Sequence, residues 1–193
     1  NGRDGYAPAP IAAYLGAEGW SLELEMREGS QHSQEGFIPF INRVIEKARS
    51  LTSRKLLVRL DSAHDALDTR VALAGHRNIS YIVKWNPRRE DQKKWADRIF
   101  KTGDVSAPRP GKRVGLLTVH IRQDHEGKTY QFKWVMRAVE RTIDRFGQIL
   151  LAPEIEGWWT PLDQPMKQVI GLYEDHGTSE QFHSEIKSDL DME

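Results

Sequence analysis

Four side chains near the carboxyl end of the chain are of the types that hold a divalent metal beside a phosphate: Tyr173, His176, Glu180 and Lys187. If the segment forms one helix, at about 100° per residue, His176 lies about 60° from Tyr173 around the axis. Glu180 lies about 20° and Lys187 about 40° from the same reference. On such a face the carboxylate would hold the metal, and its neighbours would contact phosphate oxygens.

A break in this segment leaves a second interpretation open. Gly177 and Thr178 can end one helix and begin another, since Thr178 followed by Gln181 fits a capping box. The aromatic and imidazole groups before the break would then not share the face of Glu180 in a simple way. Glu180 and Lys187 are also the kind of charges found on a solvated helix face.

A second candidate carboxylate follows a short apolar run. Leu56–Leu60 is typical of a buried central strand, and the run ends abruptly at Asp61. Chemistry in open sheets collects at the carboxyl ends of strands, which favours a functional role for Asp61. The alternative is a turn residue or the N-cap of the next helix.

The middle of the chain contains the strongest local group of cations: Lys84, Arg88, Arg89, Lys93 and Lys94. Such a group favours non-specific contact with nucleic-acid phosphates, with strong salt dependence. An ordinary solvated loop is the alternative. Arg109, Lys112 and Arg113 form a second, weaker group.

Two adjacent tryptophans, Trp158 and Trp159, follow a glycine. Consecutive side chains of a strand point to opposite faces, so we expect one of the two in the core. The other is a candidate platform on which a base could stack.

The elements that must position these residues follow from periodicity. Apolar residues spaced by three and four predict a helix over 37–51, and alternation predicts a hairpin over 6–27. The remaining expectations are a short helix over 65–74, strands at 79–83, 114–122, 130–140 and 149–152, a turn at 124–128, and a helix from Leu162 onward. Helices that follow strands indicate an α/β or α+β fold.

Composition excludes several classes of function. The chain has 193 residues, with 28 Lys and Arg, 28 Asp and Glu, and a formal net charge of zero, so bulk positive charge is not its mode of binding. It has no cysteine, which excludes disulfides, zinc–thiolate sites and cysteine nucleophiles. It also contains no nucleotide-binding glycine motif, no serine-hydrolase motif and no apolar run of membrane-spanning length.

The spacing Tyr173-x2-His176-x3-Glu180-x6-Lys187 resembles the Y-x2-R-x3-E-x6-K signature of bacterial insertion-sequence DDE transposases of the cut-and-paste branch. Three further stretches resemble the same group: Leu60-Asp61-Ser62, residues 82–87 and Gly157-Trp158-Trp159. The resemblance extends from about residue 5 to residue 193.

This resemblance implies a ribonuclease-H-like α/β core with a β-rich insertion before the last long helix. Asp61 matches the second catalytic Asp and Glu180 the catalytic Glu, and together they would hold two Mg²⁺ ions, which Mn²⁺ can replace. Tyr173 and Lys187 match residues that contact the phosphates of the transposon ends. His176 stands where the signature has Arg, and an imidazole is a weaker phosphate ligand than a guanidinium.

The implied organisation is a first part of the core over 1–85, the insertion over 86–160, and a core helix with the catalytic Glu over 161–193. The first catalytic Asp of the family lies on an earlier strand, and Asp4 is a poor substitute for it. We therefore expect this chain alone not to cleave DNA. Its implied partners are transposon ends, target DNA and a second copy of the enzyme, in the nucleoid region of a bacterial cytoplasm.

Two other functions remain open from the sequence. The first is a DNA-binding relic or fragment without chemistry. The second is a general metal-dependent nuclease of the same fold, which would cleave DNA without specificity for particular ends.

Overall fold

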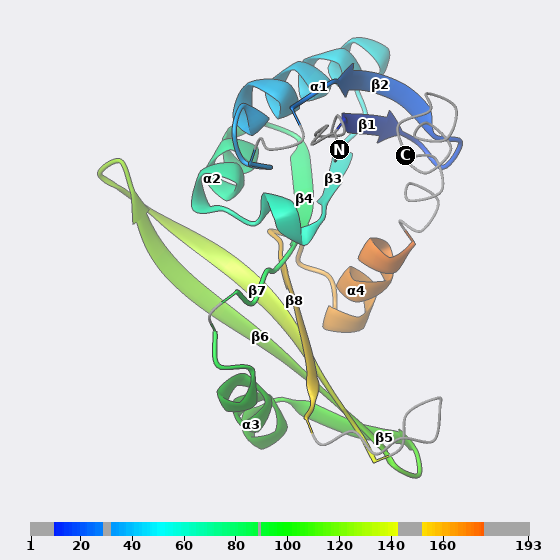
Figure 1. Cartoon of the computed structure of the whole chain (residues 1–193), viewed down its shortest axis with the longest axis vertical. Coiled ribbons are helices and arrows are strands. Elements are labelled where there is room, and N and C mark those ends of the chain that lie inside the picture. Colours follow the sequence, from blue (N-terminus) through cyan, green and yellow to red (C-terminus); the bar gives the residue numbers. More distant parts are fainter. Residues whose placement is uncertain (1–9, 29–31, 89, 143–151, 176–193) are drawn as a thin grey trace, which may run out of the picture. The chain divides into compact units, whose positions relative to one another are not determined.

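A computed structural model describes residues 10–28, 32–88, 90–142 and 152–175 (Figure 1). The first elements are β1 (Ile11–Leu15), β2 (Trp20–Glu25), α1 (Phe37–Leu51), β3 (Leu56–Leu60), the short 3-10 helix η1 (Ser62–His64), α2 (Leu67–Gly75) and β4 (Ile79–Lys84). The later elements are α3 (Gln92–Thr102), β5 (Asp104–Arg109), β6 (Lys112–His125), β7 (Lys128–Arg141), β8 (Glu154–Trp159) and α4 (Met166–Glu174).

The chain divides into two compact units. The first comprises residues 1–55 and 172–193, and the second comprises residues 56–171. The sequence-based boundaries at 85 and 160 are not boundaries of these units, because β4 and β8 are hydrogen-bonded neighbours within the second one.

In the first unit, the predicted hairpin and helix are confirmed. β1 and β2 pair antiparallel, and Gly16 and Gly19 turn the chain with φ of 76° and 71°, values that suit a residue without a Cβ. Helix α1 has the predicted bounds, and its buried side chains include Phe37, Phe40 and Ile41.

The two faces of β2 differ from what its alternating apolar pattern suggests, because the polar face and not the apolar one contacts α1. Its glutamates point toward α1: Arg43 contacts Glu25 at 2.5 Å, and Lys47 forms an ion pair with Glu23. Most apolar residues of the opposite face are exposed, with Trp20 at 68% and Met26 at 51%, whereas Leu22 is half-buried. Among the described residues, it is the glutamate face of this strand that contacts α1.

The second unit contains a six-stranded mixed sheet of order β3-β4-β8-β7-β6-β5. Strands β3 and β4 run parallel, and every other neighbouring pair is antiparallel. The prediction of a buried central strand at Leu56–Leu60 is wrong within this sheet. β3 is the edge strand and its residues are half-buried, whereas β4 is buried over nearly its whole length.

A long hairpin forms the largest part of the sheet (Figure 1). Strands β6 and β7 pair over 14 residues each, further than the predicted 114–122 and 130–140. The predicted turn is confirmed: Glu126 and Gly127 have φ of 48° and 77°, which suits a turn whose twist matches that of the strands.

Two elements of this unit were not expected. Helix α3 begins after Asp91, whose side chain accepts a hydrogen bond from the backbone of Lys94 at 3.1 Å, and strand β5 follows it directly. The last strand, β8, lies a few residues after the predicted position of 149–152, most of which is outside the described residues.

Aromatic side chains join α3 to the sheet. Trp134 of β7 stacks on Trp159 of β8 with ring centroids 4.6 Å apart. Edge contacts at 5.0 Å and 4.8 Å connect the same ring to Trp85 and to Trp95 of α3. A Cβ added at Gly157 would lie 2.4 Å from Trp134 Nε1, so this close packing requires glycine.

The chain therefore has the mixed α/β architecture that its sequence predicts. The finer assignment to a ribonuclease-H-like core stays a prediction. Within the described ranges, no helix is both long enough and apolar enough to cross a membrane.

Candidate metal and nucleic-acid site

Asp61 lies directly after β3 and is exposed. Its Oδ1 accepts a hydrogen bond from the backbone N–H of Ala63 at 2.9 Å, so the residue caps the short helix η1. The capping role left open by the sequence is thus confirmed. The hydrogen bond from Ala63 uses one carboxylate oxygen of Asp61, and this is compatible with a ligand at the other oxygen.

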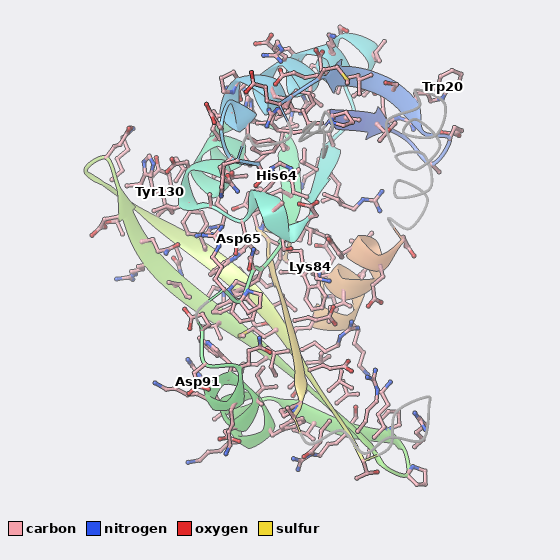
Figure 2. All side chains as sticks on the ribbon, viewed as in Figure 1. Trp20, His64, Asp65, Lys84, Asp91 and Tyr130 are labelled. Atoms are coloured by element: carbon pink, nitrogen blue, oxygen red, sulfur yellow. The ribbon has the colours of Figure 1, made fainter. Side chains whose placement is uncertain are left out.

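A buried carboxylate follows four residues later. Asp65, labelled in Figure 2, accepts a hydrogen bond from Arg70 at 2.5 Å and another from the backbone N–H of Asn86 at 2.9 Å. The side chain of Asn86 also donates to the carbonyl of Ser62 at 3.3 Å. The loop that contains Asp61 is therefore held from the carboxyl end of β4.

Arg70 extends these contacts to the long hairpin. It donates to Gln123 of β6 at 3.0 Å, and its guanidinium lies 4.2 Å from the ring centre of Trp159 and 5.3 Å from that of Phe132. Burial lowers the pKa of Arg70, and the charge of Asp65 opposes that effect. One buried ion pair thus joins the Asp61 loop, α2 and three strands of the sheet.

The predicted basic group is divided by the fold. Lys84 contacts Glu156 of β8 at 3.2 Å, and Arg88 donates to the carbonyl of Asp65 at 3.0 Å. Lys93 and Lys94 are exposed on α3. Arg89 lies outside the described residues.

Glu156 sits between two cations, because Arg137 also pairs with it. Burial acts to raise the pKa of Glu156, but hydrogen bonds from Arg137 and Lys84 outweigh that effect and lower it. Lys84 is therefore part of a structural ion-pair group on the sheet.

Both adjacent tryptophans are buried, with Trp158 at 1% and Trp159 at 5% exposed. One core residue was expected and two are found, because Arg137 covers the ring of Trp158 at 5.2 Å and the face of Trp159 is filled by Trp134 and Arg70. Neither ring offers a free face for a base in this conformation.

The residues of the carboxyl-terminal motif are only partly described. Tyr173 lies in the last turn of α4, while His176, Glu180 and Lys187 lie outside the described residues. The expected approach of Glu180 to Asp61 stays a prediction. In the described ranges, no three His, Asp or Glu side chains form a group that could hold a metal ion.

Sequence reasoning did not identify the roles of Asp65 and Arg70. A helical Arg after a loop Asp looks like surface charge, and the available signal was that Asp65 follows Asp61 in the same short loop. Asn86 lies within residues 82–87, which resemble the DDE transposases, but the sequence predicted no role for it.

The exposed carboxylate of Asp61 fits Mg²⁺ in chemical type, because this ion prefers hard oxygen ligands and usually takes one or two carboxylates from a protein. The structure thus defines a mixed α/β protein with an acidic residue in a braced loop after one of two parallel strands. No known protein-family model matches the chain, and no curated protein matches it either.

Proposed function

We propose that this chain is part of the catalytic domain of a DNA transposase that cleaves and joins phosphodiester bonds with two Mg²⁺ ions. The observation that carries the proposal is the placement of Asp61. Its carboxylate is exposed directly after a strand of a parallel pair, and Asn86 and the Asp65–Arg70 pair fix the loop around it.

The order of the elements supports the same proposal. The described chain has a hairpin, a helix, a strand that ends at Asp61, a second helix and a parallel strand. Antiparallel strands follow, and α4 comes after them. This is the order that the resemblance to DDE transposases implies.

In the proposed site, Asp61 and Glu180 would hold the metal ions. When bound, the metal pair would supply activation of the attacking oxygen and stabilisation of the leaving oxygen. Lys187 and Tyr173 would donate to phosphate oxygens and so position the DNA. Loss of one carboxylate from such a site would weaken metal binding as well as remove one contact.

Metal-directed cleavage of the polypeptide tests the site without requiring DNA cleavage. Fe²⁺ replaces Mg²⁺, and ascorbate with peroxide then generates radicals that cut the backbone next to the bound ion. We expect cuts near Asp61 and near Glu180, suppressed by excess Mg²⁺. The variant Asp61→Asn should lose both sets, whereas Asp163→Asn, which changes an exposed carboxylate elsewhere, should retain them.

Cuts at only one of the two positions, or cuts that persist in Asp61→Asn, would refute the shared metal site. A further measurement addresses the specific enzyme. The protein with its natural flanking sequence should nick DNA at defined ends in Mg²⁺, and cleavage without end preference would instead support a general nuclease.

A further inference from the structure

The outward face of α3 carries a cluster of cations. Lys93, Lys94, Arg98 and Lys101 are all exposed, and none of them forms an ion pair with a described residue. Asp97 is the one acidic residue within the helix. The helix therefore presents a net positive charge to solvent.

Several other cations of the same unit form ion pairs. Lys84 and Arg137 pair with Glu156, and Arg113 contacts Glu140 at 2.8 Å. Arg141 likewise pairs with a glutamate of β8. The described residues thus neutralise these cations but form no ion pair with those of α3.

The positions of these cations suit a repeating anionic partner. Lys94, Arg98 and Lys101 are spaced by four and three residues, which places them on one stripe about 10 Å long. The guanidinium of Arg98 lies 5.2 Å from the ring centre of Trp95. Because Trp95 also donates to Glu90 at 3.2 Å and packs on Trp134, the platform under this charge is fixed before any partner binds.

The burial of the apolar side of α3 argues against a membrane as the binding partner of this helix. Ala96 and Ile99 are buried, and none of the exposed large apolar side chains of the described chain lies on this helix. A helix that binds a membrane surface must offer an apolar face to the lipid, and α3 does not offer one. A stripe of charge alone is typical of contact with a nucleic-acid backbone.

We propose that the outward face of α3 binds the phosphate backbone of duplex DNA through Lys94, Arg98 and Lys101. The choice of DNA as the polyanion rests on the proposed function, while the binding surface rests on the charge and packing of α3. This surface differs from the group predicted from sequence, since Lys84 and Arg88 have structural partners and Arg98 and Lys101 replace them.

The test compares two triple variants of the full chain with equal net charge. The first carries Lys94→Gln, Arg98→Gln and Lys101→Gln. The control removes three exposed lysines that form no ion pair within the described chain: Lys55, Lys128 and Lys167, each changed to Gln. Binding to a short duplex of random sequence is measured by fluorescence anisotropy over a range of salt concentrations, and circular dichroism checks that both variants fold.

Three lost phosphate contacts reduce the slope of log affinity against log salt by about 2.7. If the variant and the native chain bind DNA equally at about 1 M salt, the variant binds up to about 500-fold more weakly than the native chain at about 0.1 M salt. We expect this change in the α3 variant and a much smaller one in the control. An unchanged slope in the α3 variant, or equal losses in both, would overturn the proposal.

Two further outcomes separate this surface from the metal site. If the α3 variant loses DNA binding but the native chain shows no iron-directed cuts, the surface stands and the proposed chemistry falls. If the cuts appear and the α3 variant binds DNA normally, the chemistry stands and the surface is wrong. Binding to phosphatidylserine vesicles in place of DNA would also overturn the assignment.

Discussion

Replacing Arg70 tests whether the buried ion pair stabilises the second unit. The side chains of Arg70 and Asp65 are only 6% and 8% exposed. The variant Arg70→Met keeps much of the apolar volume but leaves the Asp65 carboxylate buried beside one remaining donor, the backbone N–H of Asn86. Breaking a buried pair in this way costs about 3–5 kcal/mol, because an uncompensated charge remains in the interior.

A matched control exists on the same sheet. Arg141 pairs with Glu154, but these side chains are 28% and 52% exposed. Arg141→Met should therefore cost only about 0–1 kcal/mol. For a protein of this size, each kcal/mol lowers the Tm by about 2–4 °C, so the Arg70 variant should melt roughly 6–20 °C lower than the native protein.

Urea unfolding followed by far-ultraviolet circular dichroism measures both variants. A double variant, Asp65→Asn with Arg70→Met, removes both buried charges and should recover part of the loss seen with Arg70→Met alone. A loss below about 1 kcal/mol for Arg70→Met, or no recovery in the double variant, would refute the assignment of this pair as a buried structural link.

Three other outcomes follow from the structure. The pKa of Glu156 is lower in the folded protein than its ordinary value of 4.5, so the stability that it contributes is present above that pH and is lost as the pH falls through the folded pKa. Urea midpoints at neutral and acidic pH should show this loss in the native protein and a smaller one in Glu156→Gln. Burial raises the pKa of Tyr81 from 10.0 to about 12, so ultraviolet difference absorbance should show a late tyrosine ionisation that is absent in Tyr81→Phe, and the associated stability should fall as the pH rises between these values. Gly157→Ala should destabilise the protein by about 1–3 kcal/mol, because the added Cβ meets Trp134. Gly171→Ala in α4 should stabilise it by roughly 0.5–1 kcal/mol, because a Cβ there meets nothing within 4 Å. Thermal melts that rank the two variants in the reverse order would contradict this packing.

Local patterns predicted local elements well. Helix α1 has the bounds that its three- and four-residue apolar spacing indicates, and the β6–β7 turn lies where expected. Helix α3 was missed because its cations drew the interpretation toward a loop. Trp95, Ala96 and Ile99 nevertheless have helical spacing after an N-cap Asp, so the signal was present.

Pairings across the fold were not accessible in the same way. The apolar composition of β3 indicates burial but not its neighbours, and the sheet places it at an edge. Asp65 and Gln123 are brought to Arg70 by the packing of α2 against the sheet, which no local pattern specifies. The same limit applies to the proposed site, since local spacing cannot establish that Asp61 and Glu180 meet.

The chain of ring contacts through Trp134 gives the protein a built-in optical signal. The nearly parallel rings of Trp134 and Trp159, at 17° and 4.6 Å, are close enough for their electronic transitions to couple. Near-ultraviolet dichroism should therefore report on the packing of α3 against β7 and β8. Trp20 is 68% exposed, so its long-wavelength emission, quenched by added acrylamide, should report on the hairpin of the other unit.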